Sequence, residues 1–132
     1  MRLPSSSTRF SECQRTALDS ALVGTVFPTA ASARLPVYLP IFTALLASCA
    51  GIRRAGACAL DLAYVAAGRL DAFWVMSLKA REVAAGALLV REAGGRVGDF
   101  AGGADCLRGA EVIAAAPGIF NALRESIVTA LP

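Results

Sequence analysis

The chain contains no histidine among its 132 residues. Histidine is the commonest general base at neutral pH, the usual partner of a nucleophilic serine or cysteine, and the commonest ligand of transition metals. Its absence excludes the histidine-dependent triads and most transition-metal sites. Any chemistry must use carboxylates, hydroxyl groups, backbone amides or a hard metal ion.

The sequence also lacks paired cysteines. Its four cysteines are Cys13, Cys49, Cys58 and Cys106, and none belongs to a Cys-x-x-Cys pair, so the spacing predicts no zinc site. The first eight residues are polar and rich in serine, without the apolar stretch of an export signal. We therefore expect reduced, mostly buried cysteines in a cytoplasmic protein.

Clustered positive charge is absent as well. The 13 basic residues give a net charge of +3 and are scattered, with Arg53 and Arg54 as the closest cluster. Nucleic-acid binding requires Lys and Arg gathered on one face or helix. We expect a solvated basic surface and no direct nucleic-acid partner.

Apolar residues, in contrast, are abundant. They make up 56% of the chain, with a mean hydropathy of +0.58. Such a surplus predicts surface covered by a partner chain, a further segment or a membrane. The most apolar stretch, 37–52, is shorter than the roughly 20 residues that cross a bilayer, and it contains Pro40. We therefore favour a helix over 40–50 and no membrane, with one apolar face formed by Ile41, Leu45, Leu46 and Cys49.

Hydrophobic periodicity predicts alternating strands and helices along the rest of the chain. This order favours a layered α/β architecture in one domain over 14–132, after a loose segment 1–13 with one short strand near 9–11. We expect inner helix faces formed by Leu60, Ala63, Tyr64 and Ala67, and by Ile119, Phe120, Leu123 and Ile127. The expected elements are strands 21–27, 51–56, 71–76, 96–100 and 111–116, and helices 40–50, 57–67, 78–95 and one that begins at Pro117.

The turn 54–58 is the first candidate for chemistry. A glycine turn before a helix leaves backbone N–H groups and the positive dipole end free for an anion or a hydroxylated substrate. An ordinary tight connection explains the same pattern. Cys58 could have a lowered pKa there, although a packing role is the simpler interpretation without a nearby base.

Glu82 is the second candidate, because a carboxylate opens an otherwise apolar helix. The helix dipole alone favours an acid there by about 0.3–1 kcal/mol. Alternatively, Glu82 holds a hard metal ion such as Mg²⁺, which proteins bind through one or two carboxylates with phosphate and water. Asp61 and Asp71 could join it only through the fold, and Glu92 lies about 15 Å farther along the helix.

Residues 56–74, followed by Leu78-Lys79 and by 83–95, closely resemble the inositol monophosphatase family, nearest to its bacterial inositol-1-monophosphatases. Residues 21–28 resemble a strand of the same family, and the likeness extends from about Arg9 to the end. It implies alternating α and β layers and Mg²⁺-dependent hydrolysis of inositol phosphate monoesters by an activated water, with Li⁺ as inhibitor. It also implies a homo-oligomer.

The resemblance assigns roles to four residues. The family's Gly-x-Ala turn, which lines the sugar site, falls on Gly56, Ala57 and Cys58. Its last metal-binding aspartate falls on Glu82.

The chain departs from the family in two ways. It corresponds to the C-terminal half, and the Asp-Pro-hydrophobe-Asp-Gly-Thr motif with the other metal ligands is absent. Arg81, Glu82 and Val75 replace a Trp, the metal-binding Asp and a substrate-contacting Glu. We expect a truncated, inactive copy with no catalytic residue of its own, weak Mg²⁺ binding, and a partner supplying the missing half. The alternative is a non-catalytic interaction module.

Overall fold

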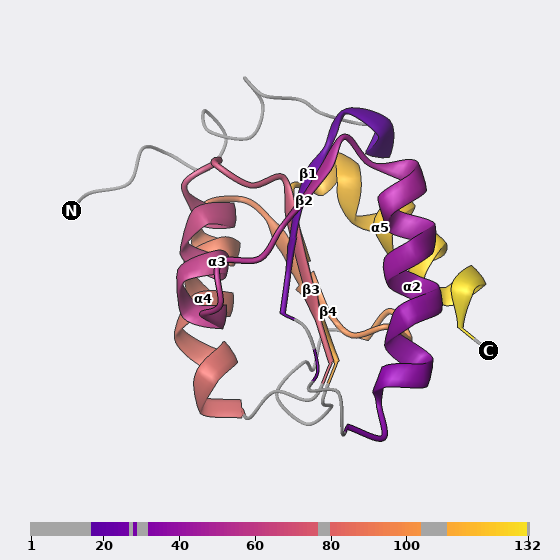
Figure 1. Cartoon of the computed structure of the whole chain (residues 1–132). Helices are drawn as coiled ribbons and strands as arrows, with labels where there is room; N and C mark the ends of the chain where they lie inside the picture. Colours follow the sequence, from indigo (N-terminus) through magenta and orange to yellow (C-terminus); the bar gives the residue numbers. More distant parts are fainter. Residues whose placement is uncertain (1–16, 27, 29–31, 77–79, 104–110, 132) are drawn as a thin grey trace.

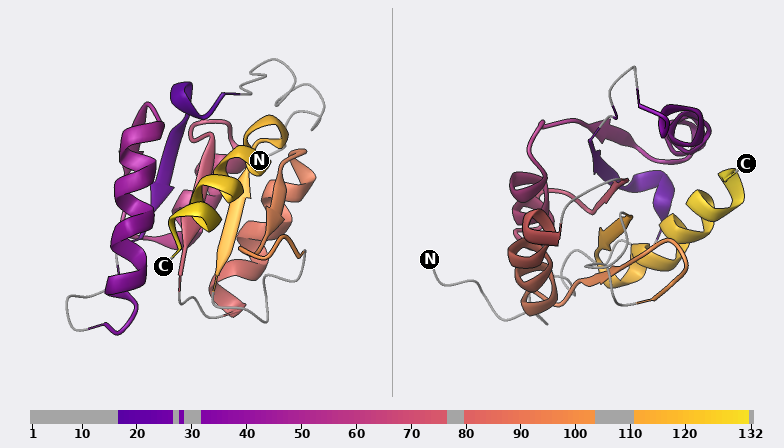
Figure 2. Two further views of the ribbon diagram at one scale, coloured as in Figure 1. Left: turned by 90° about the vertical axis from the view of Figure 1, so that its right-hand side faces the viewer. Right: turned by 90° about the horizontal axis from the view of Figure 1, so that it is seen from below.

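The protein has three layers, a β-sheet with a pair of helices on each face (Figure 1). The computed structural model describes residues 17–26, 28, 32–76, 80–103 and 111–131, without the side chains of 80–82. Helices α3 and α4 cover one face of the sheet, and α2 and α5 cover the other (Figures 1 and 2). The predicted layered α/β class is confirmed.

The predicted order of strands and helices is confirmed, and the sequence analysis missed one element, a single turn of 3₁₀ helix before the first strand. The strands are short and largely buried, as expected from their β-branched and aromatic residues. The elements are η1 (Leu18–Ser20), β1 (Leu22–Thr25), α2 (Leu35–Ser48), β2 (Gly51–Arg53), α3 (Cys58–Ala66), β3 (Ala72–Val75), α4 (Ala80–Glu92), β4 (Arg96–Gly98), β5 (Val112–Ala115) and α5 (Pro117–Ala130).

The sheet has the strand order β2-β1-β3-β5-β4 and mixed directions. Strand β1 runs parallel to both of its neighbours, so that Val23 pairs with Ile52 on one side and Ala72 on the other. Strand β5 runs antiparallel to β3 and β4. The carboxyl ends of β2, β1 and β3 therefore meet at one edge of the sheet, where ligands usually bind in α/β folds.

Helix α5 confirms its predicted inner face. Its four apolar side chains at helical spacing are all buried against the sheet: Ile119, Phe120, Leu123 and Ile127. Pro117 opens this helix, where its missing N–H has no intrahelical partner to lose.

Helix α2 begins at Leu35, five residues before the predicted start at Pro40. Pro36 occupies the favourable first turn instead, and the helix continues through Pro40. Ile41 and Leu45 are buried as predicted, but Leu46 is 56% exposed, so the predicted apolar face was wrong at that position. In the described part of the chain, no helix combines the length and apolar character needed to span a bilayer.

Helix α3 buries a different face from the one predicted. Its buried residues are Asp61, Leu62, Val65 and Ala66, whereas Leu60 from the predicted set is 42% exposed. Nearly every position of this helix is apolar, so periodicity alone could not distinguish the two faces.

The cysteines within the described residues are half-buried. Cys49 and Cys58 are both free of disulfides, but neither is in the core, so the expectation of burial was wrong for these two. Cys13 and Cys106, like the predicted loose segment and the short strand near 9–11, lie outside the described residues.

Candidate functional site

The carboxyl edge of the parallel strands brings the two predicted sites to the same side of the sheet. Strand β2 leads through 54–57 into α3, and β3 leads toward α4 (Figure 1). Strands β2 and β3 both pair with β1 in parallel register, so both of these helices begin at that edge. This arrangement follows from the alternation of parallel strands and helices.

The predicted turn adopts the conformation that its sequence favours. Gly56 has φ of +86°, a left-handed conformation that glycine reaches without steric cost. Ala57 is the N-cap of α3, with extended backbone and no side-chain cap bond, and Cys58 is the first helical residue. The backbone amides in the first turn of α3 therefore receive no cap from the side chain of Ala57. Such a helix start can offer these N–H groups to an anion or a hydroxyl group.

Glu82 lies in the first turn of α4, as predicted, but its side chain is outside the described atoms. Its role as a metal ligand stays a prediction. Among the residues that the structure describes, no group of three His, Cys, Asp or Glu side chains is arranged to hold a metal ion. Val75, which the resemblance aligned with a substrate-contacting glutamate, is 1% exposed in β3.

The fold gives Asp71 a structural role at the opposite edge of the sheet. It precedes β3, and its Oδ2 accepts a hydrogen bond from the Leu22 N–H, with an N···O distance of 2.8 Å. This bond joins the amino ends of β1 and β3. Asp71 therefore does not join Glu82, which follows the carboxyl end of β3.

Asp61 is the acid that the sequence analysis underrated. It is 1% exposed, and neither carboxylate oxygen has a hydrogen-bond partner. Burial raises the pKa of the Asp61 carboxyl to about 6, because a low-dielectric environment disfavours the charged form. The signal in the sequence was a single acid inside an apolar helix.

Asp61 borders a cleft of about 560 Å³ between α3 and the edge strand β2. Three exposed arginines line the same cleft, together with apolar residues and Tyr64. The lining residues are Leu22, Arg53, Arg54, Ala55, Asp61, Tyr64, Arg69 and Leu70.

A second buried polar group lies at the carboxyl edge. The hydroxyl groups of Thr25 in β1 and Tyr38 in α2 are hydrogen-bonded at 2.9 Å, and burial raises the pKa of Tyr38. The Tyr38 ring stacks on Trp74 with a centroid distance of 4.8 Å. The Trp74 Nε1–H is buried without a partner. These contacts fix α2 against the sheet.

The sequence profile of the inositol monophosphatase family matches residues 5–131. Relatives include the Nus factor SuhB of Pseudomonas aeruginosa, 49% identical over 120 residues, which span 89% of this chain and 44% of the relative. The inositol-1-monophosphatase of Rhizobium meliloti is 43% identical over 118 residues, 89% of this chain and 44% of that protein.

Solved structures show the same relationship. The extragenic suppressor protein SuhB of Bartonella henselae superposes with a TM-score of 0.82 at 41% identity, covering 86% of this chain and 43% of that one. The inositol monophosphatase of Anabaena gives 0.80 at 30% identity, covering 90% and 47%. The chain thus spans less than half the length of these relatives. It belongs to the inositol monophosphatase family.

Proposed function

We propose that this chain forms one part of a Mg²⁺-dependent phosphatase that hydrolyses inositol phosphate monoesters in the cytoplasm, and that it is inactive alone. The observation that carries this proposal is the family match, which takes in residues 5–131 but less than half of the relatives' length. The placement of Gly56 and of the α4 N-terminus at one edge supports it.

The described residues do not offer a donor set that fits Mg²⁺, an ion that prefers carboxylate oxygens in near-octahedral geometry. Asp71 accepts a backbone hydrogen bond at the opposite edge of the sheet, and Asp61 is buried on the inner side of α3. No catalytic step is therefore assigned to this chain alone. We infer that Glu82 contributes one carboxylate and that the other ligands come from outside these 132 residues.

The proposed contribution to substrate binding comes from Gly56, Ala57 and Cys58. The uncapped first turn of α3 offers backbone N–H donors and a positive dipole end to substrate oxygens. The space beside Gly56 is open to a ligand, because a Cβ built there meets no atom within 4 Å.

Phosphate release from inositol 1-phosphate with Mg²⁺, with and without Li⁺, tests this function. We expect none from the purified chain. We expect lithium-sensitive release after mixing with the part of the Pseudomonas relative that this chain does not cover. Glu82→Ala should abolish that release, whereas Glu92→Ala, at the exposed end of α4, should not. Release by the chain alone that Glu82→Ala removes would refute its inactivity.

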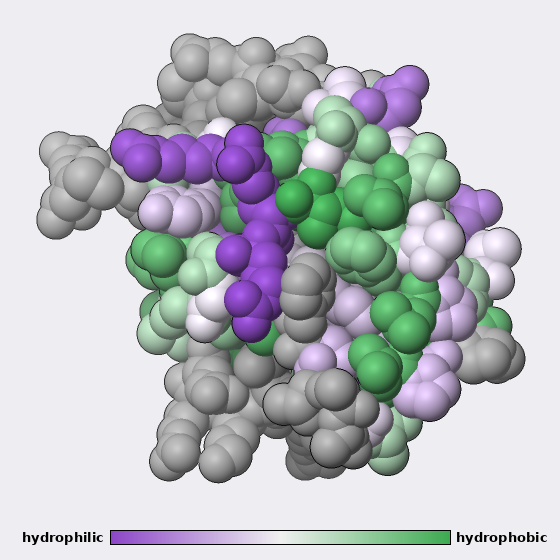
Figure 3. Space-filling model, in the orientation of Figure 1, coloured by the Kyte–Doolittle hydropathy of each residue, from purple (hydrophilic) through white to green (hydrophobic). Residues whose placement is uncertain are grey.

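The outer face of α2 and α5 is where we propose that the complementary part binds. Helix α2 has no charged residue in 14 positions, and Leu39 and Leu46 are 49% and 56% exposed on it. Figure 3 shows apolar surface gathered over this helix. Such a face is unfavourable in water and is typical of a protein interface.

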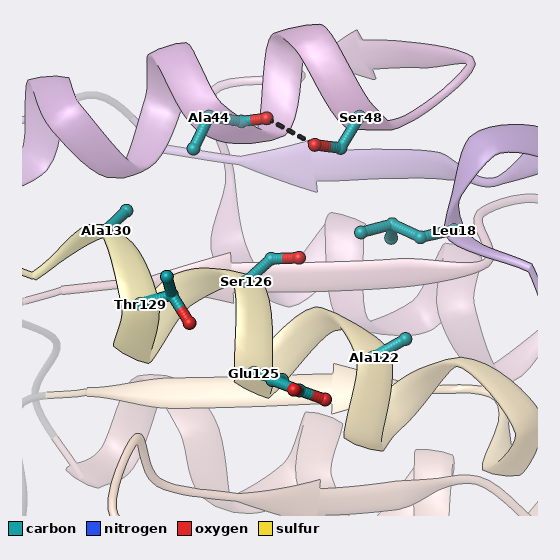
Figure 4. A pocket seen from close by; sticks show the side chains of 8 residues that line it. All are labelled: Leu18, Ala44, Ser48, Ala122, Glu125, Ser126, Thr129 and Ala130. Atoms are coloured by element: carbon teal, nitrogen blue, oxygen red, sulfur yellow. Dashed lines mark hydrogen bonds between the residues drawn. The ribbon is translucent and has the colours of Figure 1, made fainter.

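A groove between the two helices extends this face. It encloses about 650 Å³, and most of its lining side chains are small (Figure 4). Small residues let another polypeptide backbone approach closely. The lining residues are Leu18, Ala44, Ser48, Ala122, Glu125, Ser126, Thr129 and Ala130.

Two leucines of equal exposure provide a matched test. Leu46 on α2 is 56% exposed and Leu88 on α4 is 57% exposed, on opposite faces of the sheet. We expect Leu46→Gln to weaken binding of the complementary part by about tenfold, from the transfer free energy of one apolar side chain. Leu88→Gln should leave binding unchanged. Calorimetric titration measures both, and the reverse pattern would place the interface on α3 and α4.

A non-catalytic interaction module is the second candidate. It is favoured by the name of several relatives, Nus factor SuhB, which mentions no enzymatic activity. An assembly that forms with the complementary part but releases no phosphate would favour this function over the first.

A further inference from the structure

The cleft between α3 and β2 combines two features that are unfavourable while it is empty. Its lining includes Asp61, which is 1% exposed and whose two carboxyl oxygens have no hydrogen-bond partner. An unpaired buried polar group costs about 1–3 kcal/mol, and a charged one costs more. The fold retains this group where a nearly isosteric leucine would bury apolar surface instead.

The rim of the cleft is basic, with three guanidinium groups from two stretches of the chain. Arg53 ends β2, Arg54 follows it, and Arg69 lies between α3 and β3; all three are exposed. The Arg69 guanidinium carbon lies 6.0 Å from the centre of the ring of Tyr64, which also lines the cleft. Asp61 has no bond to any of them.

These charges decide what the cleft can bind. Three guanidinium groups repel a cation and match the oxygen geometry of phosphate or sulfate. An ionised Asp61 would repel the same anion, whereas its neutral form can donate a hydrogen bond to it. The groups facing the cleft that bear on this balance are Asp61 and Tyr64 from α3, Arg53 and Arg54 from β2 and its loop, and Arg69.

We propose that this cleft binds a tetrahedral oxyanion, a phosphoryl or sulfate group, between the arginine rim and the Asp61 carboxyl, which takes up a proton as the anion binds. The volume of about 560 Å³ suits a small ligand. The raised pKa of Asp61, about 6, brings this proton uptake close to neutral pH. The exposed arginine side chains can rearrange to admit the anion.

This site goes beyond the proposed phosphatase function and does not depend on it. It needs neither Mg²⁺ nor Glu82, and it uses residues of this chain alone. Binding measured in EDTA therefore succeeds or fails independently of the catalytic proposal.

Calorimetric titration of the full chain with sulfate in EDTA tests the site, because sulfate keeps its charge between pH 5 and pH 8. We expect saturable binding that weakens by about tenfold per pH unit above about pH 6, since one proton is taken up with the anion. Asp61→Asn keeps a neutral donor, so its affinity should not change with pH. Arg53→Gln and Arg69→Gln should each weaken binding about tenfold.

Arg91→Gln, an exposed arginine of α4 outside the cleft, is the matched control and should bind sulfate as the unmodified chain does. Circular dichroism establishes that each variant is folded. If Asp61→Asn does not fold, the pH profile of the unmodified chain and the Arg69→Gln variant still decide the matter. Absence of saturable sulfate binding, or the same pH profile in Asp61→Asn, would overturn the proposal.

A phosphate monoester, glycerol 2-phosphate, distinguishes the source of the anion. Tighter binding than sulfate supports an organic phosphate as the ligand. Equal affinity supports free inorganic oxyanion at the same site.

Discussion

The two helical layers of the protein are built differently although they cover the same sheet. Helices α3 and α4 pack in direct contact at Gly86, where a Cβ would come within 2.4 Å of the Leu62 side chain. Helices α2 and α5 are separated by a groove of about 650 Å³ (Figure 4). We call the α3–α4 layer closed, because its two helices are in contact, and the α2–α5 layer open, because a groove lies between its helices.

Helices α2 and α4 also differ in charge. The exposed end of α4 carries Arg91 and Glu92, whereas α2 carries no charge from Leu35 to Ser48. An exposed helix face without charge, such as that of α2, resembles the core of an interface, which is depleted of charged residues. Within the open layer, the charged residues lie on α5, which carries Arg124 and Glu125.

Gly86→Ala should be the most damaging change to the closed layer. The added methyl meets Leu62 Cβ at 2.6 Å, and a Cβ cannot move without its helix. Overpacking of this kind costs up to about 3 kcal/mol, and the better helix propensity of alanine returns about 1 kcal/mol. We expect a net loss of about 2 kcal/mol in the free energy of unfolding, measured by urea denaturation.

The double variant Gly86→Ala with Leu62→Ala sharpens this result. Removing the opposing side chain should make the added methyl harmless, although Leu62→Ala alone is destabilising. Additive losses would mean that α3 and α4 are not in contact at this point.

Asp61 should make the stability of the closed layer depend on pH. Its folded-state pKa, about 6, is raised above the ordinary value of 3.8, so the unfolded chain loses this proton at lower pH. Stability should therefore fall between about pH 4 and pH 6 and stay low above that, by about 3 kcal/mol in total. Asp61→Asn should remove this step, as urea denaturation at several pH values would reveal.

These denaturation series are run without sulfate or phosphate, so that no anion binds the folded state. A step of equal size in Asp61→Asn would assign the pH dependence to another group.

The fold could largely be predicted from the sequence because strands and helices alternate with clear boundaries. The inner face of α5 was correct because polar residues such as Asn121 and Glu125 separate its apolar positions. Helix α3 was assigned the wrong face because its residues are nearly all apolar, which leaves periodicity without contrast. Which side of α3 meets the sheet is decided by tertiary contacts such as those of Gly86.

The candidate site was predictable only in part. The conformation of the Gly56 turn followed from local backbone preference, which a sequence shows directly. The Asp61 cleft joins residues of β2, α3 and the segment before β3, which only the sheet order brings together. A buried acid also contradicts the usual rule that charge faces water, so pattern alone places it outside.

Tyr38→Phe tests how much the hydrogen bond between α2 and β1 stabilises the packing of the open layer against the sheet. It leaves the fully buried Thr25 hydroxyl without its partner at 2.9 Å, which should cost about 1 kcal/mol. The further change Thr25→Val should recover most of this loss, because both polar groups are then removed. Tyr64→Phe is the control, because Tyr64 is a half-buried residue of α3, and it should change the free energy of unfolding by less than about 0.5 kcal/mol. An equal loss of stability in Tyr64→Phe would mean that the hydrogen bond between Thr25 and Tyr38 contributes no more than the hydroxyl of Tyr64 does.

Ala122→Leu should have the smallest effect on stability, so that an effect of this variant on binding can be measured in a normally folded chain. Ala122 lines the open groove, so the larger side chain has room there that Gly86 lacks, and we expect a change within about 0.5 kcal/mol. The same substitution should nevertheless weaken binding of the complementary part, because it fills the space proposed for it. A variant as stable as the unmodified chain but unable to bind would identify the groove as interface. A variant that binds normally would leave the groove outside the interface, and a large loss of stability would show that the open layer is as tightly packed as the closed one.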